Sequence, residues 1–368
     1  MNMGKRRKYA AAAMASAAIL SAAAAARGQS HPPPPANSTV PASVLDNLPN
    51  RTLSNGILSA KVYLPGEFGF YRGTRFDHAG LVTHVTYRGQ DYSRYWFDKY
   101  ATDIHDYTYY GDDGIVAAPA SAVTGPVEEF DAIGFDDAKM GGTFLKPGVG
   151  MLKRNTDKYD HVLKYPVVNG GRRTTSATKT GITFRQVLTD KSGYGYDYVK
   201  TVRLTPGRPQ MRIEHRLTNT GTKPIVTSVY CHNFLTLSPG NAGIALTAPF
   251  ALKAERPLQP DLARVEGNTL RYVGQMKGQD MVTSPFGGFG GTAADYDFRV
   301  VDTRTGFGQR IRADQPIARI NMWSVRSVFS WEPYVAISLK PGESKSWTYT
   351  YDFFGPGENA GEHAGEHE

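Results

Sequence analysis

The strongest constraint on the fold is an alternation of core-facing and polar residues with a period of two. Between residues 211 and 217, Met211, Ile213 and Leu217 alternate with charged residues, and residues 347–353 carry an aromatic ring at every second position. Successive side chains of a β-strand point to opposite faces, so both segments are predicted to be half-buried strands. Further short β-rich runs lie at residues 182–188, 198–204, 225–231, 298–302 and 335–339.

Turn clusters rich in glycine and proline separate these runs, for example at residues 205–209, 219–221 and 340–342. Many short strands joined by such turns predict an all-β sandwich or barrel. The length of 368 residues fits one large domain or two smaller ones. Residues 45–354 contain no break in composition, which favours one domain.

The N-terminus has the pattern of an export signal. Four basic residues, Lys5 to Lys8, precede an alanine-rich, almost uncharged run that ends near Ala26. A basic segment, an apolar segment and small residues in this order predict a secretory signal peptide over residues 1–26. The Arg6-Arg7 pair also allows twin-arginine export. The alanine-rich run is too short and too weakly apolar for a transmembrane helix, so we expect no membrane span in the mature chain. Because the signal peptide would direct export, we expect a periplasmic or extracellular protein.

Two further segments are predicted to lie outside the folded domain. Residues 27–44 include four consecutive prolines, which are typical of a stiff linker. Residues 355–368 end in the sequence GEHAGEHE and are predicted to form a disordered polar tail. The formal net charge is +8, and the predicted signal peptide holds four positive charges. The net charge of the rest of the chain is therefore small and does not suggest a nucleic-acid partner.

Several classes of chemistry lack their sequence motifs. The chain has no GxxxxGK[ST] loop, no HExxH, no paired CxxC and no GxSxG. Its histidines lack the tight spacing of metal ligands, so neither a metal nor a cofactor is expected. The single cysteine, Cys231, excludes an intramolecular disulfide, and the fold must depend on its apolar core. Cys231 itself is predicted to be a small buried residue rather than a thiolate nucleophile.

The first candidate site residues are His232 and Asn233, which follow the apolar run at residues 225–229. A histidine at a strand end can face a cleft, where its imidazole exchanges protons near neutral pH. The alternative is a structural histidine. His215 is the clearer example of that alternative, because it shares a predicted core face with Met211 and Leu217.

The second candidate is Glu332, which lies between Trp331 and Pro333 and just before the predicted strand at residues 335–339. Apolar neighbours raise the pKa of a carboxyl group and suit it to proton transfer. The alternative is an exposed glutamate at the start of a strand. Trp323 and Trp331 flank this region and could stack on a sugar face, or they could pack in the core.

The third candidate is Arg75 in the segment Arg-Gly-Thr-Arg-Phe-Asp, because a guanidinium suits sugar hydroxyls or carboxylates. A surface ion pair between arginine and Asp77 is the alternative. Glu128 and Glu129 form a further acidic pair, next to the aromatic Phe130. Adjacent strand residues point to opposite faces, so at most one of these two glutamates can enter a given site.

Several of these motifs together resemble the galactose mutarotase-like (aldose 1-epimerase) superfamily. The motifs are His-Asn-Phe after a β-run, Glu-Pro-Tyr near the C-terminus, Leu-Lys-Pro-Gly-Glu and a last aromatic strand. The segments Arg-Gly-Thr-Arg-Phe-Asp and Gly-Pro-Val-Glu-Glu-Phe look like an exported bacterial branch. The resemblance implies a large antiparallel β-sandwich, often called a supersandwich.

The resemblance also implies a carbohydrate ligand and a division of roles. His232 would protonate the ring oxygen of a sugar, and Glu332 would take the proton of the anomeric hydroxyl. Arg75, Asn233 and Asp297 would contact the sugar. Trp323 is a candidate to stack on it because of its position near Glu332, not because of the resemblance. Two other functions stay open: a glycan lyase or hydrolase on the same scaffold, and a non-catalytic carbohydrate-binding domain.

Overall fold

The structure, a computed structural model, describes residues 39–358 except 67–69, 72, 102–103, 113 and 119. The predicted signal peptide, most of the predicted linker and residues 359–368 of the predicted tail lie outside the described residues. Strand β1 begins at Thr39 and the 3-10 helix η1 spans Ala42–Asn47, so the end of the predicted linker is folded. No helix among the described residues is long and apolar enough to span a membrane.

Two large antiparallel sheets form the body of the protein. The ten-stranded sheet has the order β13-β14-β15-β16-β27-β24-β23-β18-β21-β20. In chain order its strands are β13 (Arg172–Ala177), β14 (Gly181–Thr189), β15 (Gly195–Leu204), β16 (Gln210–Asn219), β18 (Ile244–Thr247), β20 (Ala263–Glu266), β21 (Thr269–Tyr272), β23 (Asp297–Asp302), β24 (Gly308–Ala313) and β27 (Ser344–Phe354).

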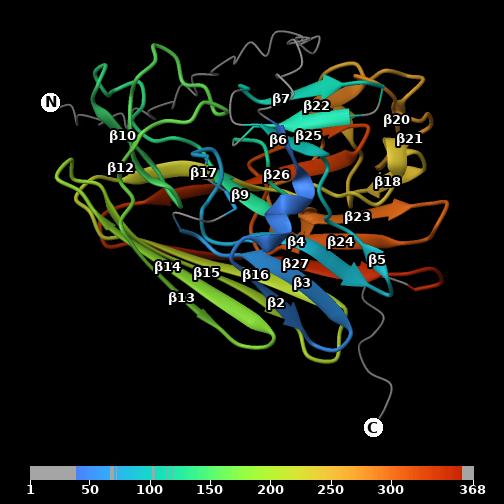
Figure 1. The fold of residues 1–368 in the computed structure, drawn as a ribbon, viewed down its shortest axis with the longest axis horizontal. Coiled ribbons are helices and arrows are strands. Elements are labelled where there is room, and N and C mark those ends of the chain that lie inside the picture. The colour runs from blue at the N-terminus through green and yellow to red at the C-terminus, as the bar shows by residue number, and fades with distance from the viewer. Residues whose placement is uncertain are drawn as a thin grey trace, which may run out of the picture.

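The six-stranded sheet has the order β19-β22-β25-β26-β17-β9 and carries the candidate site. Its strands are β9 (Val127–Phe130), β17 (Ile225–His232), β19 (Lys253–Ala254), β22 (Met281–Gly287), β25 (Arg319–Val325) and β26 (Val328–Leu339). In Figure 1, β13 to β16 run along the lower part of the molecule, and β22, β25 and β26 lie toward the top.

Three smaller sheets and two further 3-10 helices complete the described chain. They are β2 (Asn50–Ser54), β3 (Leu58–Tyr63), β4 (Leu81–Tyr87) and β5 (Gln90–Asp91); β1 (Thr39–Pro41), β6 (Lys99–Ala101), β7 (Tyr107–Tyr110) and β8 (Gly114–Ala117); β10 (Thr143–Lys146), β11 (Gly150–Lys153) and β12 (Val167–Asn169); η2 (Pro239–Asn241) and η3 (Ala293–Asp295).

The main core lies between the two large sheets, and the period-two pattern explains which residues enter it. Met211, Ile213, His215 and Leu217 of β16 are buried, as are the four aromatic residues at alternate positions of β27. A single cluster of buried side chains extends from Leu53 to Phe353. The predicted all-β sandwich is confirmed.

A second apolar cluster covers the opposite face of the six-stranded sheet. It joins residues from the N-terminal third, such as Phe76 and Trp96, to Phe234 and Val328. This cover explains the largest difference between a predicted and an observed start among the strands predicted from the sequence. Strand β26 begins at Val328 rather than after Glu332, and its residues 328–335 are all buried. A segment buried on both faces shows no alternation in its sequence, so its strand could not be recognised by period.

Candidate active site

The candidate site lies where two neighbouring strands of the six-stranded sheet face each other without backbone pairing. The ladder between β17 and β26 runs from Ile225 and Leu339 to Tyr230 and Tyr334, and an isolated bridge joins Leu235 to Phe329 in the same register. The interruption between these pairs contains Pro333, which has no N–H to donate to a ladder. The common register places His232 directly opposite Glu332.

His232 and Glu332 are in contact on the covered face of the sheet. The Nε2 atom of His232 lies 3.1 Å from Oε1 of Glu332, and the two side chains are only 4% and 7% exposed. No well-aligned hydrogen bond from the described residues reaches Glu332 Oε1. The other ring nitrogen, Nδ1, lies 2.8 Å from Oγ of Ser330, which also accepts a hydrogen bond from the backbone N–H of Asn233.

Burial shifts the pKa values of this pair in opposite directions. It raises the pKa of Glu332 to about 7, against a smaller lowering by the Arg75 charge. It lowers the pKa of His232 well below its usual range, and the Arg75 charge lowers it further. Both shifts favour the uncharged forms, a neutral imidazole and a protonated carboxyl group. A group with a pKa near the working pH is well suited to acid–base catalysis.

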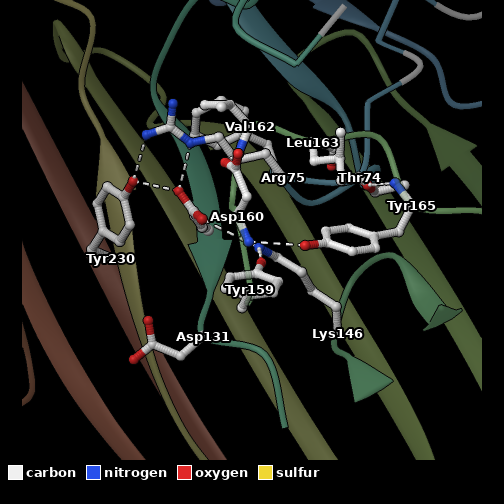
Figure 2. A network of polar contacts seen from close by, with 12 residues as sticks. Thr74, Arg75, Asp131, Lys146, Tyr159, Asp160, Val162, Leu163, Tyr165 and Tyr230 are labelled. Atoms are coloured by element: carbon white, nitrogen blue, oxygen red, sulfur yellow. Dashed lines mark hydrogen bonds and ion pairs between the residues drawn. The ribbon is translucent and has the colours of Figure 1, made fainter. Parts of the chain in front are cut away.

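Arg75 belongs to an ionic network beside this pair, shown in Figure 2. Its Nε donates to Glu129 Oε2 at 2.8 Å, and its Nη2 donates to the Tyr230 hydroxyl at 3.2 Å. Lys146 donates to the other Glu129 oxygen at 3.2 Å and to the Tyr159 hydroxyl at 2.7 Å. Two cations hold the pKa of Glu129 well below its usual range despite its burial. The network fixes Arg75 close enough to influence both His232 and Glu332.

Aromatic rings cover the pair. The Phe234 ring stacks on the His232 imidazole, with centroids 3.6 Å apart and an interplanar angle of 8°. The edges of Phe76 and Trp323 approach the same imidazole at 5.8 and 5.6 Å. Phe234 has a positive φ of 31°, which a bulky residue adopts only under constraint. The pair is therefore buried beneath a cover of aromatic side chains.

The structure brings four of the six predicted site residues together and places two elsewhere. His232, Glu332, Arg75 and Trp323 lie on or over the covered face. The side chain of Asn233 points away from it, donates to the Trp331 carbonyl and accepts from Tyr351. Asp297 lies on β23 in the other large sheet, where it binds Arg310 at the rim of an open cavity of about 280 Å³.

Trp331 also has a role other than the stacking suggested for it. It is fully buried, and its ring packs against Phe286 and Phe298 in the main core. The reason is its position in β26: Trp331 is adjacent to Glu332 in the strand, so it points to the opposite face. The alternative given for Trp331, ordinary core packing, is the observed one.

The sequence analysis missed several residues that contact the site. Ser330 and Tyr230 lie two positions from Glu332 and His232 along the same strands, so they share the site face. Asn321 of β25 lies opposite Glu332 and donates to the Tyr334 hydroxyl at 3.3 Å. The alternation of side chains along a strand could have placed Ser330 and Tyr230 on the site face. The position of Asn321 opposite Glu332 is known only from the pairing of β25 with β26.

The described residues offer no cluster of three or more histidine, cysteine or acidic side chains suited to a metal ion. A second open cavity, of about 480 Å³, is lined by residues 254–258, 260 and 263–265, away from His232 and Glu332. The contact between His232 and Glu332 lies outside both cavities. The fold and this pair define an all-β protein with a buried histidine–glutamate site.

Comparison with solved structures assigns the fold. A putative aldose 1-epimerase from Escherichia coli K12 superposes with a TM-score of 0.50 at 13% identity, over 84% of this chain and all of that one. A Caenorhabditis elegans GalM/aldose epimerase homologue (TM-score 0.48, 12% identity) covers 84% and 99% of the two chains, and a Lactobacillus casei galactose mutarotase-like protein (0.46, 13%) covers 83% and 100%. No protein-family model and no curated protein sequence matches. The chain has the galactose mutarotase-like fold, as predicted.

Proposed function

We propose that this protein is an exported enzyme that interconverts the anomers of a sugar, with Glu332 and His232 as its acid–base pair. The observation that carries the proposal is the 3.1 Å contact between His232 Nε2 and Glu332 Oε1 on the covered sheet face. The fold supports a carbohydrate substrate, because the E. coli protein described above is named a putative aldose 1-epimerase. Export rests on the sequence of residues 1–26.

The opposite pKa shifts of the two groups support the following starting roles. Glu332 holds a proton near pH 7 and donates it to the ring oxygen, while neutral His232 accepts the proton of the anomeric hydroxyl at Nε2. The bond between the anomeric carbon and the ring oxygen breaks and leaves an open-chain aldehyde. Rotation about the adjacent carbon–carbon bond presents the other carbonyl face. Ring closure returns one proton to Glu332 and delivers the other from His232 to the new anomeric hydroxyl.

This assignment reverses the roles that the family resemblance implies, in which the histidine is the first acid. The stronger acid form of histidine is the imidazolium cation, and the burial of His232 among aromatic rings disfavours that cation. A protonated glutamate beside a neutral histidine has no net charge, so its burial beneath the aromatic cover costs less free energy than burial of a charged pair. The proposed reaction forms the ion pair only transiently.

Substrate binding requires space over the pair. Phe234 occupies the face of the imidazole and must move away when a sugar enters. Trp323 is half-buried beside His232 and is placed to cover the apolar face of that sugar. Arg75 is held by Glu129 and Tyr230 at a position from which its guanidinium can reach a sugar hydroxyl.

Exchange NMR between α and β anomers tests the proposal on a panel of aldoses and oligosaccharides. We expect wild-type protein to accelerate exchange on at least one sugar, and His232→Ala or Glu332→Gln to reduce that rate 10²- to 10⁴-fold, the usual contribution of a positioned acid or base. His84→Ala is the matched control, because His84 binds Asp91 on a different sheet. A wild-type rate equal to that of His232→Ala on every sugar would overturn the proposal.

A further inference from the structure

Ser330 contacts the acid–base pair without being able to take over its chemistry. Its side chain is fully buried on β26, two residues before Glu332 and on the same face of the sheet. Its Oγ lies 2.8 Å from Nδ1 of His232, on the side of the imidazole away from Glu332. The pair and Ser330 therefore form a continuous line: Glu332 Oε1, His232 Nε2, His232 Nδ1 and Ser330 Oγ.

The hydrogen-bond roles along this line depend on which ring nitrogen carries the proton. A neutral imidazole has one N–H donor and one bare acceptor nitrogen. If Nδ1 carries the proton, it needs an acceptor, and Ser330 Oγ is the group within reach. Nε2 is then bare and faces Glu332 at 3.1 Å as a proton acceptor. If Nε2 carries the proton, His232 cannot accept one from a sugar at that nitrogen.

We propose that Ser330 is a positioning residue, which holds His232 in the Nδ1–H tautomer and so makes Nε2 the base of the site. This inference rests on the proposed function and extends it. The Ser330 hydroxyl oxygen accepts from Nδ1–H of His232 and from the backbone N–H of Asn233. A hydroxyl oxygen can accept both hydrogen bonds because it has two lone pairs.

The surrounding charged groups do not offer a substitute for Ser330. Arg75, Glu129 and His161 influence His232 through space, while its other ring contacts are the side chains of Phe76, Phe234, Trp323 and Tyr230. Tyr334, next to Glu332 on the same face, binds Asn321. The described structure gives Nδ1 only Ser330 as a hydrogen-bond partner. Removal of the hydroxyl therefore leaves a buried N–H donor unsatisfied, and the tautomer with that donor is disfavoured.

The test is a direct measurement of the tautomer by NMR on full-length protein labelled with ¹⁵N-histidine, at pH 6. We expect the Nδ1–H pattern for His232 in the wild type and in Ser330→Thr, which keeps the hydroxyl. In Ser330→Ala we expect the Nε2–H pattern. An Nε2–H pattern in the wild type, or an Nδ1–H pattern that persists in Ser330→Ala, would overturn the proposal.

Two further measurements separate this role from a general effect on folding and from the proposed function. Ser324→Ala removes another fully buried serine from the adjacent strand β25 and is expected to leave the His232 tautomer unchanged. On any sugar that the wild type turns over, Ser330→Ala should lower kcat with little change in KM, by about 10- to 100-fold if its effect matches that of residues that orient metal-binding histidines. If no sugar is turned over, the proposed function fails, while the tautomer measurement still decides the role of Ser330.

Discussion

Glu128 and Glu129 are neighbours on β9, and they serve opposite faces of the six-stranded sheet. Glu129 faces the site and binds Arg75 and Lys146. Glu128 faces the main core, where it binds Lys200 and lies 2.9 Å from Nε2 of His215. The sequence predicted that only one of the pair could enter a given site. The structure adds that the other anchors the same strand in the core.

The core cluster makes a prediction about stability. Lys200 is fully buried and is the cation between Glu128 and Asp77. Lys200→Met would leave two buried carboxyl groups without their cation, and we expect a loss of about 3–5 kcal/mol in the free energy of unfolding. Urea denaturation followed by tryptophan fluorescence measures it. Arg185→Ala breaks the exposed pair with Asp197 and serves as the control with little or no change; equal losses in the two variants would contradict the argument.

A second prediction concerns pH. The pKa of Glu332 is about 7 in the folded protein and 4.5 in its ordinary state, so the folded protein binds this proton more tightly than the unfolded chain. Its contribution to stability is complete below pH 4.5 and falls as the pH rises through 7, by about 3 kcal/mol in total. Glu332→Gln cannot ionise and should not show this loss. Urea unfolding from pH 5 to pH 8.5 compares the two proteins.

The comparison with Glu332→Gln is needed because His232 acts in the opposite direction. Burial lowers the pKa of His232, so its contribution to stability is lost as the pH falls below about 6.5. Both proteins keep His232, and its effect largely cancels in their difference. The free-energy gap between variant and wild type should therefore widen toward high pH. Parallel curves would show that Glu332 titrates at an ordinary pKa.

The only cysteine provides a third prediction. Cys231 points into the core, its sulfur accepts a hydrogen bond from the Tyr351 hydroxyl, and burial raises the pKa of its thiol. We expect no reaction with a thiol reagent in the folded protein and one equivalent after unfolding. Cys231→Ser should keep anomer exchange wherever the wild type has it. Rapid labelling of the folded protein would instead place the thiol at a surface.

Whether a strand of this protein can be predicted from the sequence depends on whether one or both of its faces are buried. Strands β16 and β27 have one buried and one solvent-facing side, so their alternation revealed both the strands and their core residues, including His215. Strand β26 is buried on both sides around Glu332, and its N-terminal half carries no such signal. Much of the cover comes from the N-terminal third of the chain, including Phe76 and Trp96, and no local sequence pattern shows that these residues pack there.

The site residues, like the strands, were predictable where the signal is local and not where it depends on the pairing of distant strands. His232 and Glu332 were found from their local setting, at the end of an apolar run and beside Trp331 and Pro333. Their contact depends on the register of β17 against β26, which the sequence does not state. Asn233 was misplaced for a physical reason: it is adjacent to His232, and its amide is used by Trp331 and Tyr351 on the other face. Asp297 was predicted to bind sugar from the family resemblance alone, and it lies in the ten-stranded sheet, away from His232 and Glu332.

The last prediction concerns access to the imidazole. Phe234 stacks on His232, and its backbone φ of 31° shows that the surrounding structure holds it in a conformation that is costly for a phenylalanine. Phe234→Ala should uncover the imidazole face and increase the rate at which diethyl pyrocarbonate modifies His232, measured by peptide mass spectrometry. Phe76→Ala removes an edge contact to the same ring and is the matched control. The increase should be larger for Phe234→Ala, because a stacked ring shields the whole face of the imidazole and an edge contact shields only part of it. If both variants leave the rate at the wild-type value while their thermal midpoints show a folded protein, Phe234 is not what closes the site, and sugar entry must be controlled by another part of the cover.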